Sequence, residues 1–90
     1  MKCEEKIPGG KMVCLELWQS GGRVSRARIT GDFFLHPEDA ISRIERDLVG
    51  IPLSAGEGEI AFRIRESLGD ALLIGATPED LSRMFRKAVG

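Results

Sequence analysis

The sequence predicts an α+β fold in a single domain, in which a β-hairpin or small antiparallel sheet packs against about three helices. Residues 12–18 alternate between apolar and other side chains, as in a strand that is covered on one side. Two later stretches, 37–49 and 60–68, carry apolar residues at helical spacing, and a third helix is predicted near the C-terminus. A chain of 90 residues has room for one modest core, so residues 1–90 are predicted to form one domain.

The first predicted strand, 12–18, places three apolar side chains on one face: Val13, Leu15 and Leu17. Cys14 lies in the same run and is expected to be a small buried side chain. Residues 8–10, Pro-Gly-Gly, are expected to form a flexible turn that leads the N-terminal segment into this strand. Residues 20–22, Ser-Gly-Gly, predict a tight reversal after it.

A second strand is predicted over 23–34, which completes the hairpin. Val24 is out of phase with the later apolar residues of this segment, Ala27, Ile29 and Phe33. The change of phase indicates a β-bulge or irregular start near Ser25.

The corner after this strand combines Gly31 with Pro37, which is expected to preset the first turn of a helix. Glu38 and Asp39 would then cap that helix, where acidic side chains are favourable. The helix is predicted over 37–49 from four apolar residues at helical spacing: Ala40, Ile41, Ile44 and Leu48.

A second, shorter helix is predicted over 60–68, and Phe62 falls off its apolar stripe. Residues 71–75 form a short apolar run that favours a third strand, although periodicity alone does not distinguish it from a buried connection. Thr77 and Pro78 then predict the start of the last helix, as an N-cap hydroxyl followed by a proline at the first helical position.

The charge balance argues against a general attraction to nucleic acid or to anionic membranes, since 13 basic and 14 acidic residues give a net charge of −1. Basic recognition would have to be local. Arg26 and Arg28 project from one face of the second strand, and Trp18 is expected to lie near them, a composition typical of protein-binding surfaces. The alternative is a phosphate- or nucleic-acid-binding module that uses Arg23, Arg26 and Arg28.

The residues offer little material for independent catalysis, because the chain has one histidine and no tyrosine. A small enzyme would depend on Asp32, His36 and Glu38, and the acids near this corner could also hold a divalent cation. Neither a phosphate-binding glycine motif nor a long apolar span is apparent. Cys3 and Cys14 do not suggest a disulfide framework, so a reducing cytoplasm is expected.

The chain resembles the small C-terminal, or accessory, domain of lipoate-protein ligases, in the form where that domain is a separate polypeptide. The resemblance covers essentially the whole chain and rests on four blocks of residues. The first is 5–6 with 8–11, and the second is 29–34. The third is 37–38 followed by Ile41, 44–45, Leu48 and Gly50, and the fourth is 75–80. Within it, the Gly31-Asp32-Phe33-Phe34 block is the most specific part.

The resemblance implies an accessory subunit that works beside a larger catalytic protein, which would hold lipoate, ATP and magnesium. Lipoate would be activated as lipoyl-AMP and passed to a lysine of a lipoyl domain or a glycine-cleavage carrier protein. No catalytic, cofactor-binding or metal-binding residue is carried over to this chain. The residues expected to shape or contact a partner are Gly31, Asp32, Phe33, Phe34, His36, Arg26, Arg28 and Trp18.

Overall fold

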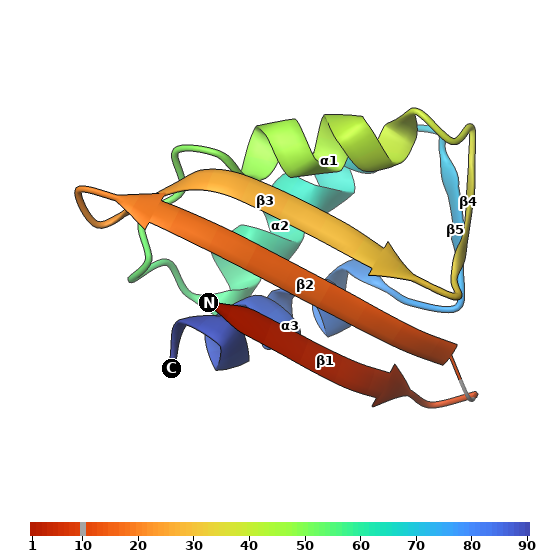
Figure 1. Ribbon diagram of the computed structural model, residues 1–90. Coiled ribbons are helices and arrows are strands. Elements are labelled where there is room, and N and C mark those ends of the chain that lie inside the picture. The colour runs from red at the N-terminus through yellow and green to blue at the C-terminus, as the bar shows by residue number, and fades with distance from the viewer. Residues whose placement is uncertain (10) are drawn as a thin grey trace.

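The computed structural model describes residues 1–9 and 11–90, with all their side chains except that of Phe34. Within these residues the chain forms five strands and three helices, which Figure 1 shows in place. In chain order they are β1 (Lys2–Ile7), β2 (Lys11–Ser20), β3 (Arg23–Gly31), β4 (Phe34–His36), α1 (Ala40–Leu48), α2 (Glu57–Leu68), β5 (Leu72–Ile74) and α3 (Pro78–Val89). The predicted α+β class is confirmed.

The strands form two antiparallel sheets, one of β1, β2 and β3 in that order and one of β4 and β5. α1 and α3 pack on one face of the three-stranded sheet, and α2 packs against both helices (Figure 1). The other face of this sheet carries no helix (Figure 1). The most deeply buried side chains come from the sheet and from all three helices and include Val13, Leu15, Leu17, Ile44, Leu48, Ile60, Ile64, Met84 and Phe85.

The hairpin of β2 and β3 follows the sequence prediction closely. Its register shifts between Trp18 and Gln19, which pair with Arg26 and Val24 and leave Ser25 as the extra residue. The predicted bulge is therefore confirmed, and it returns Val24 to the buried face. Cys14, in contrast, is only half-buried, because its position on β2 points away from the helices.

The N-terminal segment forms a strand, β1, whereas the sequence predicts only a lead into the sheet. It pairs with β2 over its whole length, from Lys2 opposite Glu16 to Ile7 opposite Lys11. Pro8 and Gly9 form the predicted turn, and Gly10 lies outside the described residues. The sequence of β1 does not alternate clearly between apolar and polar residues, because Glu5 occupies an inward position. Arg83 and Lys87 of α3 form ion pairs with Glu5 there.

The second predicted strand ends earlier than expected. β3 ends at Gly31, which has a φ of +153°, and β4 begins at Phe34. A Cβ at Gly31 would lie 2.9 Å from the Cα of Val13 and closer still to the carbonyl oxygen of Met12, so only glycine fits this turn. The chain leaves the first sheet here, and Phe33 lies between the two strands rather than inside one.

The first helix begins later than predicted and is not capped by its acidic residues. α1 starts at Ala40, whose amide donates a 3.0 Å hydrogen bond to the Pro37 carbonyl in the preceding turn. Asp39 holds the N-cap position with a helical φ of −68°, and its side chain makes no cap hydrogen bond. A capping side chain reaches the helix amides from an extended backbone, so the prediction that Glu38 and Asp39 cap α1 is wrong.

The start of α3 matches the prediction. Thr77 is extended, and its hydroxyl oxygen accepts a 3.0 Å hydrogen bond from the Asp80 amide. The Asp80 carboxylate accepts a 2.9 Å hydrogen bond from the Thr77 amide, and Pro78 occupies the first turn. The predicted third strand is also confirmed as β5, which pairs with β4.

Candidate interaction surfaces

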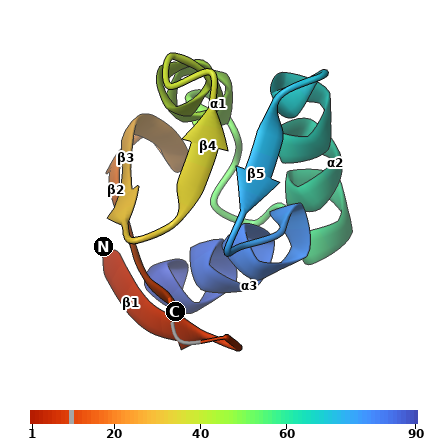
Figure 2. The same ribbon diagram turned by 90° about the vertical axis from the view of Figure 1, so that its right-hand side faces the viewer.

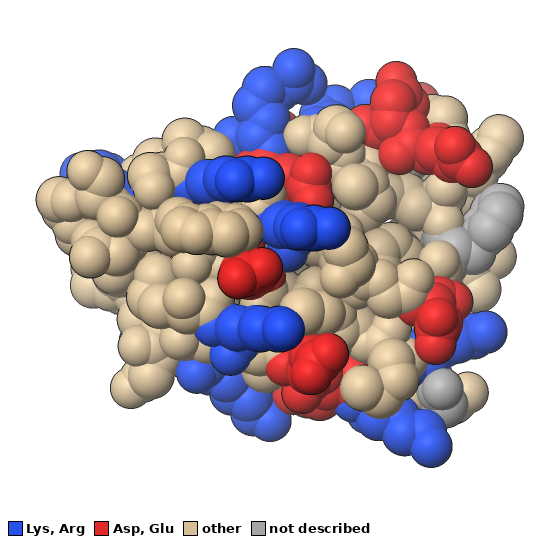
Figure 3. Space-filling model, in the orientation of Figure 1, with Lys and Arg blue, Asp and Glu red and all other residues tan. Residues whose placement is uncertain are grey.

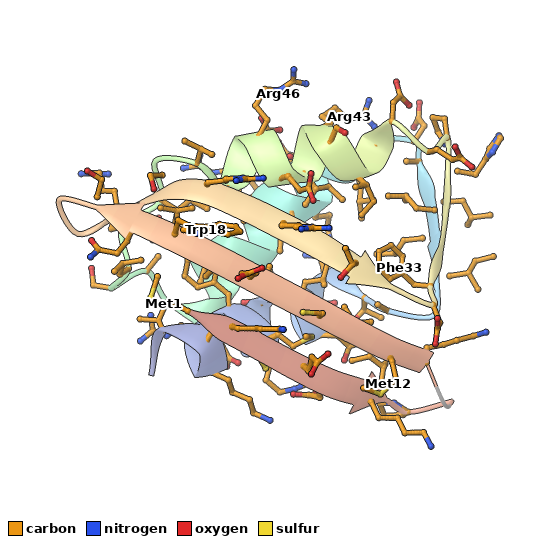
Figure 4. All side chains as sticks on the ribbon, in the orientation of Figure 1. Met1, Met12, Trp18, Phe33, Arg43 and Arg46 are labelled. Carbon is orange, nitrogen blue, oxygen red and sulfur yellow. The ribbon has the colours of Figure 1, made fainter. Side chains whose placement is uncertain are left out.

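The open face of the three-stranded sheet carries Trp18 beside Arg26, as expected. The two residues lie opposite each other on β2 and β3, with the Arg26 guanidinium 4.7 Å from the centroid of the Trp18 ring. Figure 4 shows Trp18 on the sheet face that the helices leave uncovered. Arg28 lies opposite Glu16 on the same face. The proximity is confirmed, whereas a role of these residues in an interface stays a prediction.

Arg23 does not join this group. Its guanidinium donates a 2.8 Å hydrogen bond to the Gly50 carbonyl and so ties the end of the hairpin to the segment after α1. The Arg26 guanidinium is stacked on the Trp18 ring, and Arg28 lies opposite Glu16. The alternative of a phosphate-binding strip therefore loses one of its three arginines to a structural contact.

The residues of the Gly31 corner lie at the other end of the hairpin. Gly31 pairs with Val13, roughly 17 Å along β2 from Trp18 at about 3.4 Å per residue. The predicted site residues therefore belong to two separate surfaces. Asp32 and His36 are exposed, while Phe33 is half-buried and packs against the core.

A shallow hollow of about 280 Å³ adjoins this corner and is lined by Phe33, Leu35, Glu38 and Ile41. Its walls are mostly apolar, with one carboxylate. A second hollow, of about 430 Å³, lies between α2 and α3, where Arg65 and Glu79 form an ion pair beside Gly58, Ala61 and Ser82. Neither hollow could be inferred from the sequence, because each joins residues from different elements.

The acids near the corner do not form a metal site. Within residues 1–9 and 11–90, no three His, Cys, Asp or Glu side chains are grouped so that they could hold a metal ion. The hypothesis that Asp32, Glu38 and Asp39 hold a divalent cation is thus without geometric support. The hypothesis of a small enzyme built on Asp32, His36 and Glu38 stays a prediction. Cys3 and Cys14 are free thiols.

A network of ion pairs joins β1 to α3 through Glu5, Arg83 and Lys87 and is not evident from the sequence. Hydrogen bonds from Arg83 and then Lys87 hold the pKa of the Glu5 carboxyl below its ordinary value. The Glu5 carboxylate in turn raises the pKa of the Arg83 guanidinium. Next to this group, burial raises the pKa of the Cys3 thiol. The sequence does not reveal this group, because Glu5 and Arg83 lie 78 residues apart in the chain.

A second surface that the sequence reasoning missed lies on β5. Leu72 and Ile74 are 56% and 52% exposed, whereas Leu73 between them is half-buried. The sequence left open whether residues 71–75 form a strand or a buried connection, and β5 is a strand with only Leu73 turned inward. No helix in the described part of the chain is long and apolar enough to cross a membrane.

The fold is a small α+β domain, and its described residues include no group of side chains that could hold a metal ion. Neither a family model nor a curated protein sequence matches the chain. Among solved structures, it is similar to a chain from an archaeal lipoylation system, described as a bi-partite lipoate protein ligase and its E2 lipoyl domain from Thermoplasma acidophilum. The TM-score is 0.79 and the sequence identity 29%, over 96% of this chain and 93% of that one.

This match confirms the resemblance to lipoate-protein ligases that the sequence indicates. It extends over almost the full length of both chains, so it includes the three-stranded sheet as well as the helices and the β4–β5 end.

Proposed function

We propose that this chain is the small accessory subunit of a bipartite, ATP-dependent lipoate-protein ligase. The observation that carries the proposal is the similarity, at 29% identity and a TM-score of 0.79, to a chain from a bi-partite lipoate protein ligase system. The exposed apolar side chains of β5 and the stacked Arg26 and Trp18 add support, since both are typical of protein-binding surfaces.

In this proposal the larger subunit holds lipoate, ATP and magnesium and carries out the chemistry in the cytoplasm. The small chain binds no cofactor and forms a heterodimer with the large subunit. It is needed when lipoate is activated as lipoyl-AMP, before the lipoyl group passes to a lysine of a lipoyl domain or a glycine-cleavage carrier protein. Nucleic acid and membranes are not its partners.

Lipoate-dependent exchange between ATP and pyrophosphate tests the proposal directly. The large ligase subunit from the same organism is assayed alone and with increasing amounts of this chain. We expect exchange to rise with the small chain and to saturate near one copy per large subunit. An exchange rate that does not respond to the small chain would contradict the proposal.

A second assay separates activation from transfer. Preformed lipoyl-AMP is supplied with the large subunit and an acceptor domain, and acceptor lipoylation is followed by mass spectrometry. If the small chain acts at activation, lipoyl-AMP should bypass most of the requirement for it. An equal requirement in both assays would mean that the small chain is needed at the transfer step as well as at activation.

A further inference from the structure

The β4–β5 sheet has an unusual outer face. Leu35 and Leu73 lie opposite each other and turn toward the core, whereas Leu72 and Ile74 turn outward and are more than half exposed. Figure 1 shows the two strands at one end of the molecule, and Figure 2 shows them side by side. A sheet of two short strands is only marginally stable in water, so an uncovered apolar face on it is costly to maintain.

Acidic side chains lie at one end of this sheet. Because His36 pairs with Leu72, the residues after β4 and those before β5 lie at the same end of it. That end carries Glu38, Asp39 and Asp70, all exposed. Figure 3 shows acidic side chains gathered toward the end of the molecule where β4 lies.

The ion pairs of the described residues involve other carboxylates, on Glu5, Glu79 and Asp80. Arg43 of α1, the first lysine or arginine after β4 in the chain, donates its hydrogen bonds to the carbonyls of Ser67 and Leu68. At the other end of the two strands, the Lys11 side chain lies beside Gly75, and Asp32 precedes β4. The apolar face thus has an acidic rim at its α1 end and a mixed rim at the other.

A hollow lined by Phe33, Leu35, Glu38 and Ile41 lies on the inner side of β4 and shares Glu38 with the acidic rim. Three of its four walls are apolar, and the fourth supplies a carboxylate from the acidic rim. A long apolar or basic side chain from a partner would fit such a hollow, with its apolar part inside and a positive group near Glu38.

We propose that the β4–β5 end docks the large catalytic subunit, through a patch on that subunit that is apolar at its centre and basic at its rim. For this surface we define the apolar centre as Leu72 and Ile74, with Glu38, Asp39 and Asp70 as the acidic rim. The inference rests on the proposed function for the identity of the partner. Charge complementarity and apolar contact specify the chemistry of that partner's surface.

Leu72→Thr combined with Ile74→Thr tests the apolar centre, because threonine keeps the strand propensity while removing the apolar surface. Binding of the full chain to the large subunit is measured by titration calorimetry, with the thermal midpoint of the free chain as a check on folding. We expect the dissociation constant to rise at least about 30-fold. The matched control is Phe62→Thr on α2, whose side chain is 61% exposed and lies outside the β4–β5 sheet; it should bind as the wild type does.

Charge reversal tests the rim independently. Glu38→Lys with Asp70→Lys should slow association about tenfold at low salt, and the effect should shrink as salt is added. Glu4→Lys with Glu59→Lys changes the net charge equally at positions outside the rim and should not slow association.

Each outcome bears on the proposal. Binding by the wild type that both pairs of variants leave unchanged would overturn the docking surface and keep the proposed function. No binding by the wild type would overturn both. Self-association of the isolated chain that Leu72→Thr and Ile74→Thr abolish would also overturn the docking surface, because a second copy would then be its occupant.

Discussion

The amide of Ile29 on β3 donates a 2.7 Å hydrogen bond to the carboxylate of Glu45 on α1. β3 is an edge strand, so its outward amides have no neighbouring strand to accept their hydrogen bonds. The Glu45 carboxylate is the acceptor near the end of the strand. Near the start, the Ile51 carbonyl accepts a 3.0 Å hydrogen bond from the amide of Val24. The helix therefore both covers the core and closes the edge of the sheet.

Glu45→Ala should destabilise the fold by about 1–2 kcal/mol, because a partly buried amide loses its acceptor. Unfolding in urea, followed by circular dichroism, gives the free energy. Glu45→Gln keeps an acceptor oxygen at the same position and should cost clearly less. Equal losses for the two variants would show that packing of α1, rather than the hydrogen bond, sets the effect.

Gly31→Ala should destabilise the fold far more than the small size of the added methyl group suggests. The added Cβ would meet the backbone of Met12 and Val13, and a φ of +153° is itself unfavourable for alanine. We expect a loss of more than about 3 kcal/mol, or no folded protein. The matched control is Gly58→Ala on α2, where the new Cβ meets no atom within 4 Å.

Gly58→Ala should raise stability by about 0.5–1 kcal/mol, since alanine is the better helix former. Both variants are compared by their urea midpoints. A Gly31→Ala protein as stable as the wild type would mean that the corner shifts to accept a side chain, and the close approach to Met12 would then not explain the glycine.

Local signals explain what the sequence predicts well. The Thr77 hydroxyl and Pro78 act on the backbone of their own helix turn, and the predicted start of α3 is correct. The bulge at Ser25 follows from a change of phase of the apolar residues along one strand. It can therefore be predicted without knowledge of the strand that pairs with it.

Long-range partners explain what the sequence does not predict. Glu5 faces inward on β1 because Arg83, 78 residues further along the chain, neutralises the charge of its carboxylate. β4 and β5 are short strands whose pairing depends on the turn at Gly31, and their outer face becomes visible only once His36 is set opposite Leu72. The acids at residues 38 and 39 look like caps in the sequence, but the turn before α1 places Asp39 in a helical conformation.

The contact between Arg26 and Trp18 can be followed by fluorescence, since Trp18 is the one tryptophan of the 90-residue sequence. Arg26→Ala should uncover the ring face and move its emission to longer wavelength, with a stability loss of about 0.5–1 kcal/mol. Arg28→Ala, which removes a charge from the same strand without touching the stack, is the control. Unchanged emission in Arg26→Ala would mean that the two side chains spend little time stacked in solution.

Glu5 should make the stability of the fold depend on pH in the acidic range. Arg83 and Lys87 hold the pKa of its carboxyl below the ordinary value of 4.5, so the unfolded chain takes up a proton at higher pH than the folded one does. The stabilisation is therefore fully present above about pH 4.5 and is lost as the pH falls through the folded-state pKa. Because Arg83 and Lys87 are partly exposed, we expect about 1 kcal/mol or less.

Glu5→Gln tests this dependence, because it keeps the size of the side chain and removes the titrating group. Thermal midpoints are measured from neutral pH to below pH 4.5 for the wild type and the variant. We expect the variant to be less stable at neutral pH and the difference to narrow as the pH falls. Glu79→Gln, which removes the carboxylate of the exposed pair with Arg65, should change the profile less, since water screens that pair. A Glu5→Gln profile parallel to that of the wild type would assign the acid sensitivity to other carboxylates.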